Sequence, residues 1–294
     1  MNTWPQPELT QDPAEWLGDA HPLVQQLGTA DGLTSLHAQR AFREYPAIEY
    51  NEFPLPEDYK EASEFVFARL MYPPAATARF DRSRRRGGVS TWAEGRSSWT
   101  QDYPRADRHF LSALRRLTRI HTRSVEQPVN LDDGDDVYNW PFLYAVRPGE
   151  WELSDEQAAR FHDYLARGGF FMTDDFWGTF EWDVFMRSMG KVLPGQNPED
   201  LANAEGIFHT IYNLDDRYQI PGAWGIYGRG YQNDGSEPFW RGIKDPKGRV
   251  IAAMIPNSDL GDSWEYADSP TYPEKYSALG IRIGVNYIVY AMTH

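Results

Sequence analysis

The chain contains 294 residues, enough for one large domain or two small ones. Its 41% hydrophobic and 24% charged residues indicate a folded protein, and its net charge of −14 disfavours binding to the phosphate backbone of nucleic acid. The absence of cysteine excludes disulfides, thiolate nucleophiles and Cys-ligated metal. We therefore expect an acidic folded chain in which only histidines, carboxylates and amides could bind a metal ion.

Residues 1–60 contain seven prolines and are predicted to form a Pro-rich N-terminal arm, followed by a single domain over residues 61–294. Trp4 and Trp16 would anchor this arm, either on its own domain or on a partner subunit. No apolar stretch approaches the roughly 18 residues that span a membrane, and residues 1–13 show no signal-peptide pattern.

From residue 64 onward the pattern alternates between strands and helices. In chain order it predicts a strand at 65–71, a helix at 103–122, strands at 129–131 and 142–146, a helix at 155–167, a strand at 170–173, a helix at 179–189, strands at 207–212 and 249–255, and a helix at 277–292. Ser154 and Gln157 form a capping box, and Gly168 with Gly169 ends that helix. This alternation predicts a three-layer α/β domain, with a mainly parallel sheet and helices on both faces.

Polar side chains follow several of the predicted strands at the point where each strand ends. In parallel α/β sheets ligands bind outside the carboxyl ends of the strands, so these residues are candidates for a ligand site. They are Tyr72, Asp132, Asp133, Asp174, Asp175, Asn257, Ser258 and Asp259.

Asp174 and Asp175 are the sharpest candidates because they directly follow a buried strand. Adjacent side chains point in opposite directions, so one carboxylate would face a ligand while the other caps the next segment. If either met Asp132, Asp133 or Asp259, the carboxylates would repel unless protonated or bridged by a hard cation such as Mg²⁺ or Ca²⁺. The alternatives are therefore an acid/base or metal centre, or simple capping and loop hydrogen bonds.

His209 lies inside the predicted strand 207–212, where it is either a hydrogen-bonded core histidine or a base or metal ligand. Residues 257–265 are predicted to form a loop that rims a pocket, with Trp264 and Trp177 as its walls. Tryptophan together with aspartate fits carbohydrate recognition, but it also fits a protein interface.

Residues 76–125 carry 12 arginines, four acids and no lysine. Arg82, Arg84, Arg85 and Arg86 are predicted to form an exposed loop that docks an anionic partner or pairs with the acidic remainder of the chain. A P-loop, a Gly-x-Gly-x-x-Gly motif and a Gly-x-Ser-x-Gly elbow are all absent, which disfavours nucleotide binding and serine hydrolysis.

Six segments resemble a bacterial family catalogued as domain of unknown function 4159: FVFARLMY at 65–72, WTQDYP at 99–104, GGFFMTDDFWG at 168–178, GIFHTIYNL at 206–214, NSDLGDSWE at 257–265 and GVNYIVYAMT at 284–293. That family is similar to ThuA-like and class I glutamine-amidotransferase-like proteins. The resemblance implies a flavodoxin-like sheet and a periplasmic or cell-envelope location. The resemblance implies no particular reaction, since the amidotransferases use a cysteine nucleophile and this chain has no cysteine.

Two functions remain open from the sequence. The first is a noncatalytic ligand-binding protein or accessory subunit of a cell-envelope assembly, with the arm and the arginine loop as contacts. The second is a carbohydrate-active or metal-assisted hydrolase, in which Asp174 or Asp175 acts as acid/base or cation ligand together with Asp259 and His209. No cofactor is predicted apart from a divalent cation in the second case.

Overall fold

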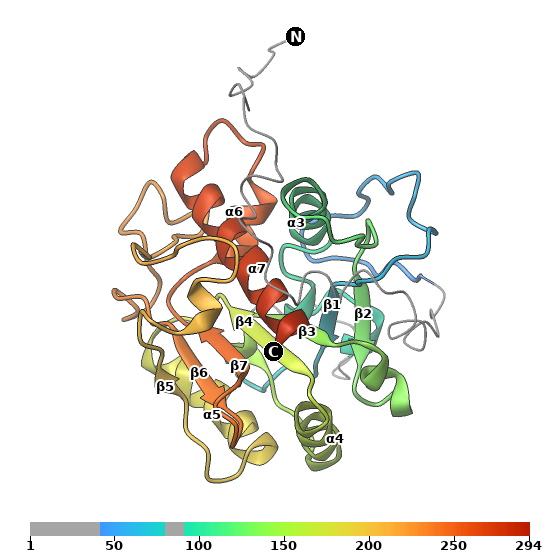
Figure 1. Cartoon of the computed structure of the whole chain (residues 1–294), viewed down its shortest axis with the longest axis vertical. Coiled ribbons are helices and arrows are strands. Elements are labelled where there is room, and N and C mark those ends of the chain that lie inside the picture. Colours follow the sequence, from blue (N-terminus) through green and yellow to red (C-terminus); the bar gives the residue numbers. More distant parts are fainter. Residues whose placement is uncertain (1–41, 80–90) are drawn as a thin grey trace, which may run out of the picture. The chain divides into compact units, whose positions relative to one another are not determined.

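A computed structural model describes residues 42–79 and 91–294 of the chain (Figure 1). All of these residues except Thr293 belong to one compact unit, which comprises Gln39–Met292 and His294. Trp4 and Trp16, the predicted anchors of the arm, lie outside the described residues, as do Arg82, Arg84, Arg85 and Arg86. Within residues 42–79 and 91–294, no helix is both long and apolar enough to cross a bilayer.

The centre of the unit is a seven-stranded sheet with the order β2-β1-β3-β4-β7-β6-β5. In this order the strands from β2 to β7 run parallel to one another. Two further strands extend the sheet, since β6 pairs with β7 antiparallel and β5 pairs with β6 antiparallel. Their bounds are β1 Ala68–Met71, β2 Gln127–Asn130, β3 Phe142–Val146, β4 Phe170–Asp174, β5 Glu199–Asp200, β6 Arg241–Lys244 and β7 Val250–Ile255. The central strands β3, β4 and β7 are buried at every position, in keeping with the apolar sequences of β3 and β7 and of the first three residues of β4.

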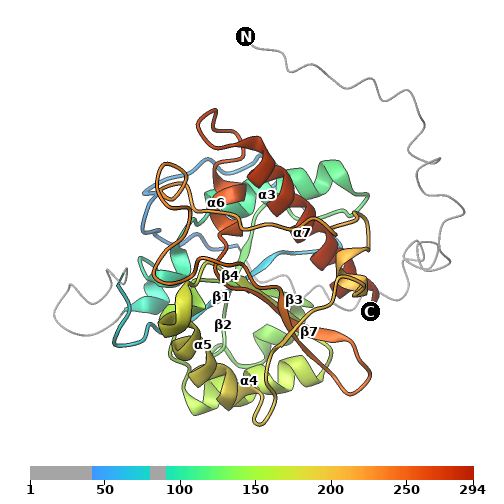
Figure 2. The ribbon, with the colours of Figure 1, turned by 90° about the vertical axis from the view of Figure 1, so that its left-hand side faces the viewer.

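Helices cover both faces of this sheet. Figure 2 shows α4 and α5 on one side and α3, α6 and α7 on the other, and each group packs on its own hydrophobic core. The bounds are α3 Arg105–Leu117, α4 Asp155–Ala166, α5 Gly178–Val192, α6 Leu260–Glu265 and α7 Glu274–Thr293. Short 3-10 helices lie at Trp92–Glu94, Ser98–Thr100, Gly134–Asn139, Pro148–Glu150 and Gly206–Phe208. The predicted α/β organisation with a mainly parallel sheet is therefore confirmed.

The local sequence signals at the two ends of α4 predicted its start and its stop correctly. The side chain of Ser154 accepts from the backbone of Gln157, whose side chain accepts in turn from the backbone of Ser154, so the capping box is present. Gly168 has φ of +101° after α4, the left-handed conformation that a helix stop requires. The strand that follows ends level with β3, because Val146 pairs with Asp174.

The predicted strand at 207–212 is wrong. Residues Gly206–Phe208 form a 3-10 turn instead, and the backbone beyond it is satisfied by one side chain of α7. The Asn286 side-chain oxygen accepts from the N–H groups of Ile211 and Tyr212, and its amide donates to the carbonyl of Tyr212. A buried asparagine thus replaces the strand ladder that the apolar alternation suggested.

The prediction of a loop at 257–265 is also wrong in part, since α6 occupies Leu260–Glu265. Asp259 caps this helix by accepting from the Asp262 N–H at 2.7 Å. The short antiparallel strands β5 and β6 were not predicted, because strands of two and four residues carry too little alternation to be recognised.

Candidate functional site

A cavity of about 440 Å³ lies at the carboxyl edge of the parallel strands. Segments that follow four different strands line it: Gln101 follows β1, Arg147 follows β3, Asp175 and Trp177 follow β4, and Asp259 and Asp262 follow β7. Glu49 and a glycine-rich loop between residues 222 and 232 complete the wall. The fold therefore gathers acidic, basic and aromatic side chains from distant parts of the sequence.

The two adjacent aspartates at the end of β4 have different roles. Asp174 is fully buried and accepts from the Tyr144 hydroxyl at 2.7 Å and from the Leu260 and Gly261 N–H groups at the start of α6. Burial raises its pKa to about 7, although the Tyr144 hydrogen bond opposes this effect. Asp175 points the other way and lines the cavity.

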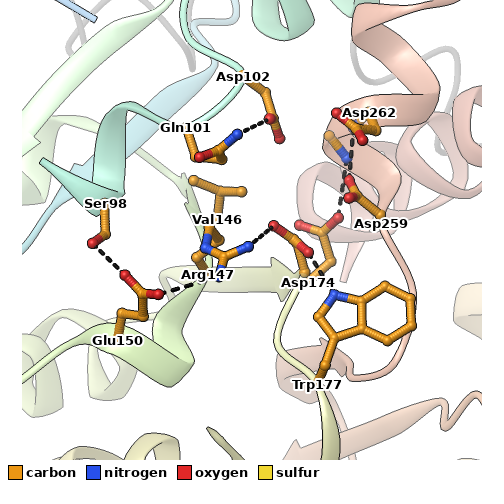
Figure 3. A network of polar contacts seen from close by, with 12 residues as sticks. Ser98, Gln101, Asp102, Val146, Arg147, Glu150, Asp174, Trp177, Asp259 and Asp262 are labelled. Atoms are coloured by element: carbon orange, nitrogen blue, oxygen red, sulfur yellow. Dashed lines mark hydrogen bonds and ion pairs between the residues drawn. The ribbon is translucent and has the colours of Figure 1, made fainter. Parts of the chain in front are cut away.

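Arg147 compensates the charge of Asp175. Its guanidinium donates to Asp175 at 3.0 Å and to Glu150 at 3.2 Å, and Trp177 Nε1 donates to the other oxygen of Asp175 at 2.6 Å (Figure 3). Glu150 also accepts from the Ser98 hydroxyl at 2.6 Å. Burial raises the pKa of Asp175, while the Arg147 charge opposes that rise. Arg147 therefore supplies a counter-charge that the carboxylates of Asp175 and Glu150 share.

Three further carboxylates have no such counter-charge among residues 42–79 and 91–294. Asp102, Asp259 and Asp262 are buried, and one carboxylate oxygen of each lies within 4.8 Å of an oxygen of the other two. Burial raises the pKa of Asp102 and of Asp259 well above the usual range, and neighbouring carboxylates raise both further. Burial also raises the pKa of Asp262 to about 6.

Figure 3 shows Asp102 opposite Asp259 and Asp262, which come from the N-terminal turn of α6. Backbone groups hold part of this arrangement: Asp259 accepts from the Asp262 N–H, and Asp262 accepts from the Ala223 N–H at 2.6 Å. One oxygen of Asp102 accepts from Gln101 Nε2 at 3.0 Å. The other, Oδ2, is buried and has no hydrogen-bond partner within the parts of the chain that the structure describes. An acceptor oxygen of this kind suits a hard cation.

Residues 89–292 match the family described as Domain of unknown function (DUF4159). The chain belongs to the DUF4159 family. The match includes the carboxylate cluster, Arg147 and the whole sheet except β1, so the cavity is part of the family's own domain except where Ile48 and Glu49 join it. No curated protein matches the chain.

Three residues around this DUF4159 cavity have unusual backbone conformations. Asp102, Arg147 and Asp175 have φ of +59°, +51° and +51°, a region that non-glycine residues seldom adopt. Each such position costs about 1 kcal/mol or more and persists only where the surroundings enforce it. The strain therefore coincides with the charged residues at the carboxyl edge, as it does in many functional sites.

The outer rim of the DUF4159 cavity is aromatic. Trp224 lines the cavity and is 91% exposed, and Tyr227 in the same loop is 81% exposed. Gly222 allows this loop to approach the acidic cluster, because a Cβ there would lie 2.7 Å from Asp259 Oδ2 and 3.0 Å from Asp262 Oδ2.

Several residues predicted from the sequence do meet at this cavity: Asp175, Trp177 and Asp259 line it, and Asp174 lies directly behind it. Asn257 lies instead at a neighbouring cavity of about 330 Å³, where its side chain accepts from the Gly178 N–H and donates to the Glu237 carbonyl. Asp132 does not reach the cluster. It follows the edge strand β2 and accepts from Gln157 Nε2 at 2.9 Å.

Two further predictions need correction. His209 is exposed, caps the 3-10 turn, and contacts the Asn203 carbonyl at 2.6 Å rather than the cavity. Trp264 is not a pocket wall: it is fully buried and stacks on Phe110 with ring centroids 4.4 Å apart. A tryptophan on the inner face of a helix packs in the core, which a loop prediction could not anticipate.

Sequence reasoning missed Asp102, Arg147 and Glu49 as site residues. Arg147 directly follows β3, so the rule that selected polar residues at strand ends could have found it. Asp102 and Glu49 carry no such signal, because one lies far beyond β1 and the other precedes the sheet altogether.

Proposed function

We propose that this DUF4159 protein is a metal-assisted hydrolase. The observation that carries the proposal is the group of three buried carboxylates, Asp102, Asp259 and Asp262, whose oxygens converge within 4.8 Å. Buried like charges at this separation require protonation or a cation. Three carboxylate ligands and an adjoining open cavity leave coordination positions for water and substrate, as a catalytic cation requires.

A divalent cation in this position would lower the pKa of a bound water and supply a hydroxide nucleophile near neutral pH. Asp175 is the candidate base or substrate-orienting group, since it faces the cavity and is held by Arg147 and Trp177. Asp174 has a positioning role, because its oxygens accept from Tyr144 and from the start of α6. His209 has no part in this proposal.

The lining favours a carbohydrate as the substrate class. Trp224 and Tyr231 offer aromatic faces, while Gln101 and Gln232 offer amides for hydroxyl groups. Sugar rings stack on aromatic faces and are oriented by a few polar contacts of this kind.

We further propose that the sheet is of the flavodoxin-like type found in ThuA-like and class I glutamine-amidotransferase-like proteins. The order β2-β1-β3-β4-β7 of the parallel strands supports this, since it follows the 2-1-3-4-5 pattern of that fold with an antiparallel extension. In that pattern ligands bind at the switch point between the first and third strands, which here is bordered by Gln101 and Arg147.

The test combines cation binding and hydrolysis. Titration calorimetry with Mg²⁺, Ca²⁺ and Mn²⁺ is expected to show binding to the wild-type chain and at least tenfold weaker binding to Asp259→Asn. Asp216→Asn removes an exposed carboxylate and serves as the matched control. Cation-dependent release of nitrophenol from a panel of nitrophenyl glycosides and acetylated sugars would support hydrolysis. No cation binding at millimolar concentration would refute the proposal.

A noncatalytic accessory subunit of a periplasmic or cell-envelope assembly is the second candidate. The exposure of Trp224 and Tyr227 favours it, because tryptophan and tyrosine are enriched where proteins meet. Purification of the native protein distinguishes the two: a stable complex that depends on Trp224, together with absence of any cation effect, would favour the subunit over the hydrolase.

A further inference from the structure

A second group of carboxylates adjoins the first. Glu49, Asp102 and Glu265 also place one oxygen each within 4.8 Å of one another, so Asp102 belongs to both groups. Glu49 precedes the sheet, Asp102 precedes α3, and Glu265 is the last residue of α6. We propose that these five carboxylates form a centre for two divalent cations, bridged by Asp102; this inference rests on the proposed function of the first group.

Buried carboxylate oxygens without hydrogen-bond partners among the described residues indicate both cation positions, independently of how close the carboxylates lie to one another. Glu265 is fully buried, its Oε1 accepts from the Tyr50 hydroxyl, and its Oε2 has no hydrogen-bond partner among the described residues. Asp102 is 1% exposed, and its Oδ2 likewise lacks a partner there. A buried acceptor without a donor costs about 1 to 3 kcal/mol, so two of them side by side indicate missing ligands. Cations would satisfy both oxygens.

When all five carboxylates are ionised, the charge of the cluster calls for more than one cation. The five carboxylates form no salt bridge with a lysine, arginine or histidine in residues 42–79 or 91–294. Arg147, which lines the same cavity, pairs with Asp175 and Glu150. When all five are ionised, one divalent cation would leave three negative charges in a site where every carboxylate except that of Glu49 is buried, whereas two cations would leave one.

Hydrogen bonds hold Glu49 in position to bind the second cation. Its oxygens accept from Gln101 Nε2 at 2.7 Å and from the Asp102 N–H at 2.9 Å. The surrounding segment is tied to α3, where Arg108 pairs with Glu44 at 2.7 Å. Residues before the sheet therefore complete the second position.

Glu49, Asp259 and Asp262 line the cavity, so both cations would be accessible to one ligand. Cation pairs bridged by a carboxylate lie about 3.5 to 4 Å apart and hold the attacking and leaving oxygens of a displacement. The expected occupants are hard, oxygen-preferring cations such as Mg²⁺, Mn²⁺ or Ca²⁺.

Mn²⁺ is the probe that tests this inference. Equilibrium dialysis of the full chain is expected to give two Mn²⁺ per wild-type chain, with the spin-coupled electron paramagnetic resonance spectrum of a close pair. Glu265→Gln should bind one Mn²⁺ and lose the coupling, and Asp262→Asn should behave in the same way from the other side. Asp102→Asn should lose both ions or bind them at least a hundredfold more weakly, while Asp216→Asn should bind two.

The outcomes separate this inference from the proposed function. One uncoupled Mn²⁺ per wild-type chain, unaffected by Glu265→Gln, would refute the second cation and leave the metal-assisted hydrolase standing. No bound Mn²⁺ would refute both. If Glu265→Gln does not fold, as judged by circular dichroism, the wild-type stoichiometry and spectrum still decide the question.

Discussion

Replacement of Asp262 by asparagine should stabilise the cation-free protein while reducing cation binding from two ions to one. Burial raises the pKa of Asp262 to about 6 from an ordinary value of 3.8, so at pH 7.5 the folded chain contains a buried anion that the unfolded chain exposes to water. A shift of about two pH units corresponds to about 3 kcal/mol. Asparagine keeps the shape and can still accept from the Ala223 N–H.

The sign follows from proton binding. Because the folded-state pKa is raised, the folded chain holds this proton more tightly, and stability falls as pH rises from about 4 to about 6. In EDTA at pH 7.5, Asp262→Asn is therefore expected to raise the free energy of unfolding by up to about 3 kcal/mol, and at pH 5 by about half as much.

Urea unfolding at both pH values measures this difference, with Asp216→Asn as the control for loss of an exposed charge. Saturating Mg²⁺ should stabilise the wild-type chain more than Asp262→Asn, which retains only one of the two cation positions. Destabilisation by Asp262→Asn in EDTA at pH 7.5 would refute the reasoning, because it would mean that the carboxylate contributes to folding rather than to function.

Other changes probe the same edge of the sheet. Burial raises the pKa of Asp174 to about 7, so this residue should lower the free energy of unfolding of the wild-type chain by up to about 4 kcal/mol between pH 4 and 7. Asp174→Asn should remove this pH-dependent decrease. An unchanged pH profile of urea midpoints would contradict the prediction. Gly261→Ala should weaken Mn²⁺ binding at least tenfold in dialysis, because its Cβ would lie 2.1 Å from Asp102 Oδ2. In the control Gly190→Ala, in α5, the added Cβ would meet no atom within 4 Å. This variant should stabilise the chain by about 0.5 to 1 kcal/mol without affecting cation binding. Trp224→Ala should leave the urea midpoint nearly unchanged because the side chain is 91% exposed, yet reduce fluorescence quenching by sugars; equal quenching would rule out stacking there.

The candidate site could be predicted only where its residues follow strands directly. Asp174 and Asp175 come after an apolar run that reads as a strand, and their opposite orientations follow from the alternation of side chains. Which carboxylates they would meet depended on strand order. Because β2 is an edge strand and β7 adjoins β4, Asp259 reaches the cluster and Asp132 does not.

The sequence by itself predicted the local features of several helices and strands. The capping box at Ser154, the stop at Gly168 and the buried runs of β3, β4 and β7 depend on residues close together in the chain, and they establish the alternation of a mainly parallel α/β sheet. Tertiary structure alone decided the rest. The side chain of Asn286 determined that residues 207–212 form no strand, and the convergence of Glu49, Asp102 and Glu265 created the second carboxylate group. Such contacts join residues more than fifty positions apart, and their free energy depends on burial that no local pattern encodes.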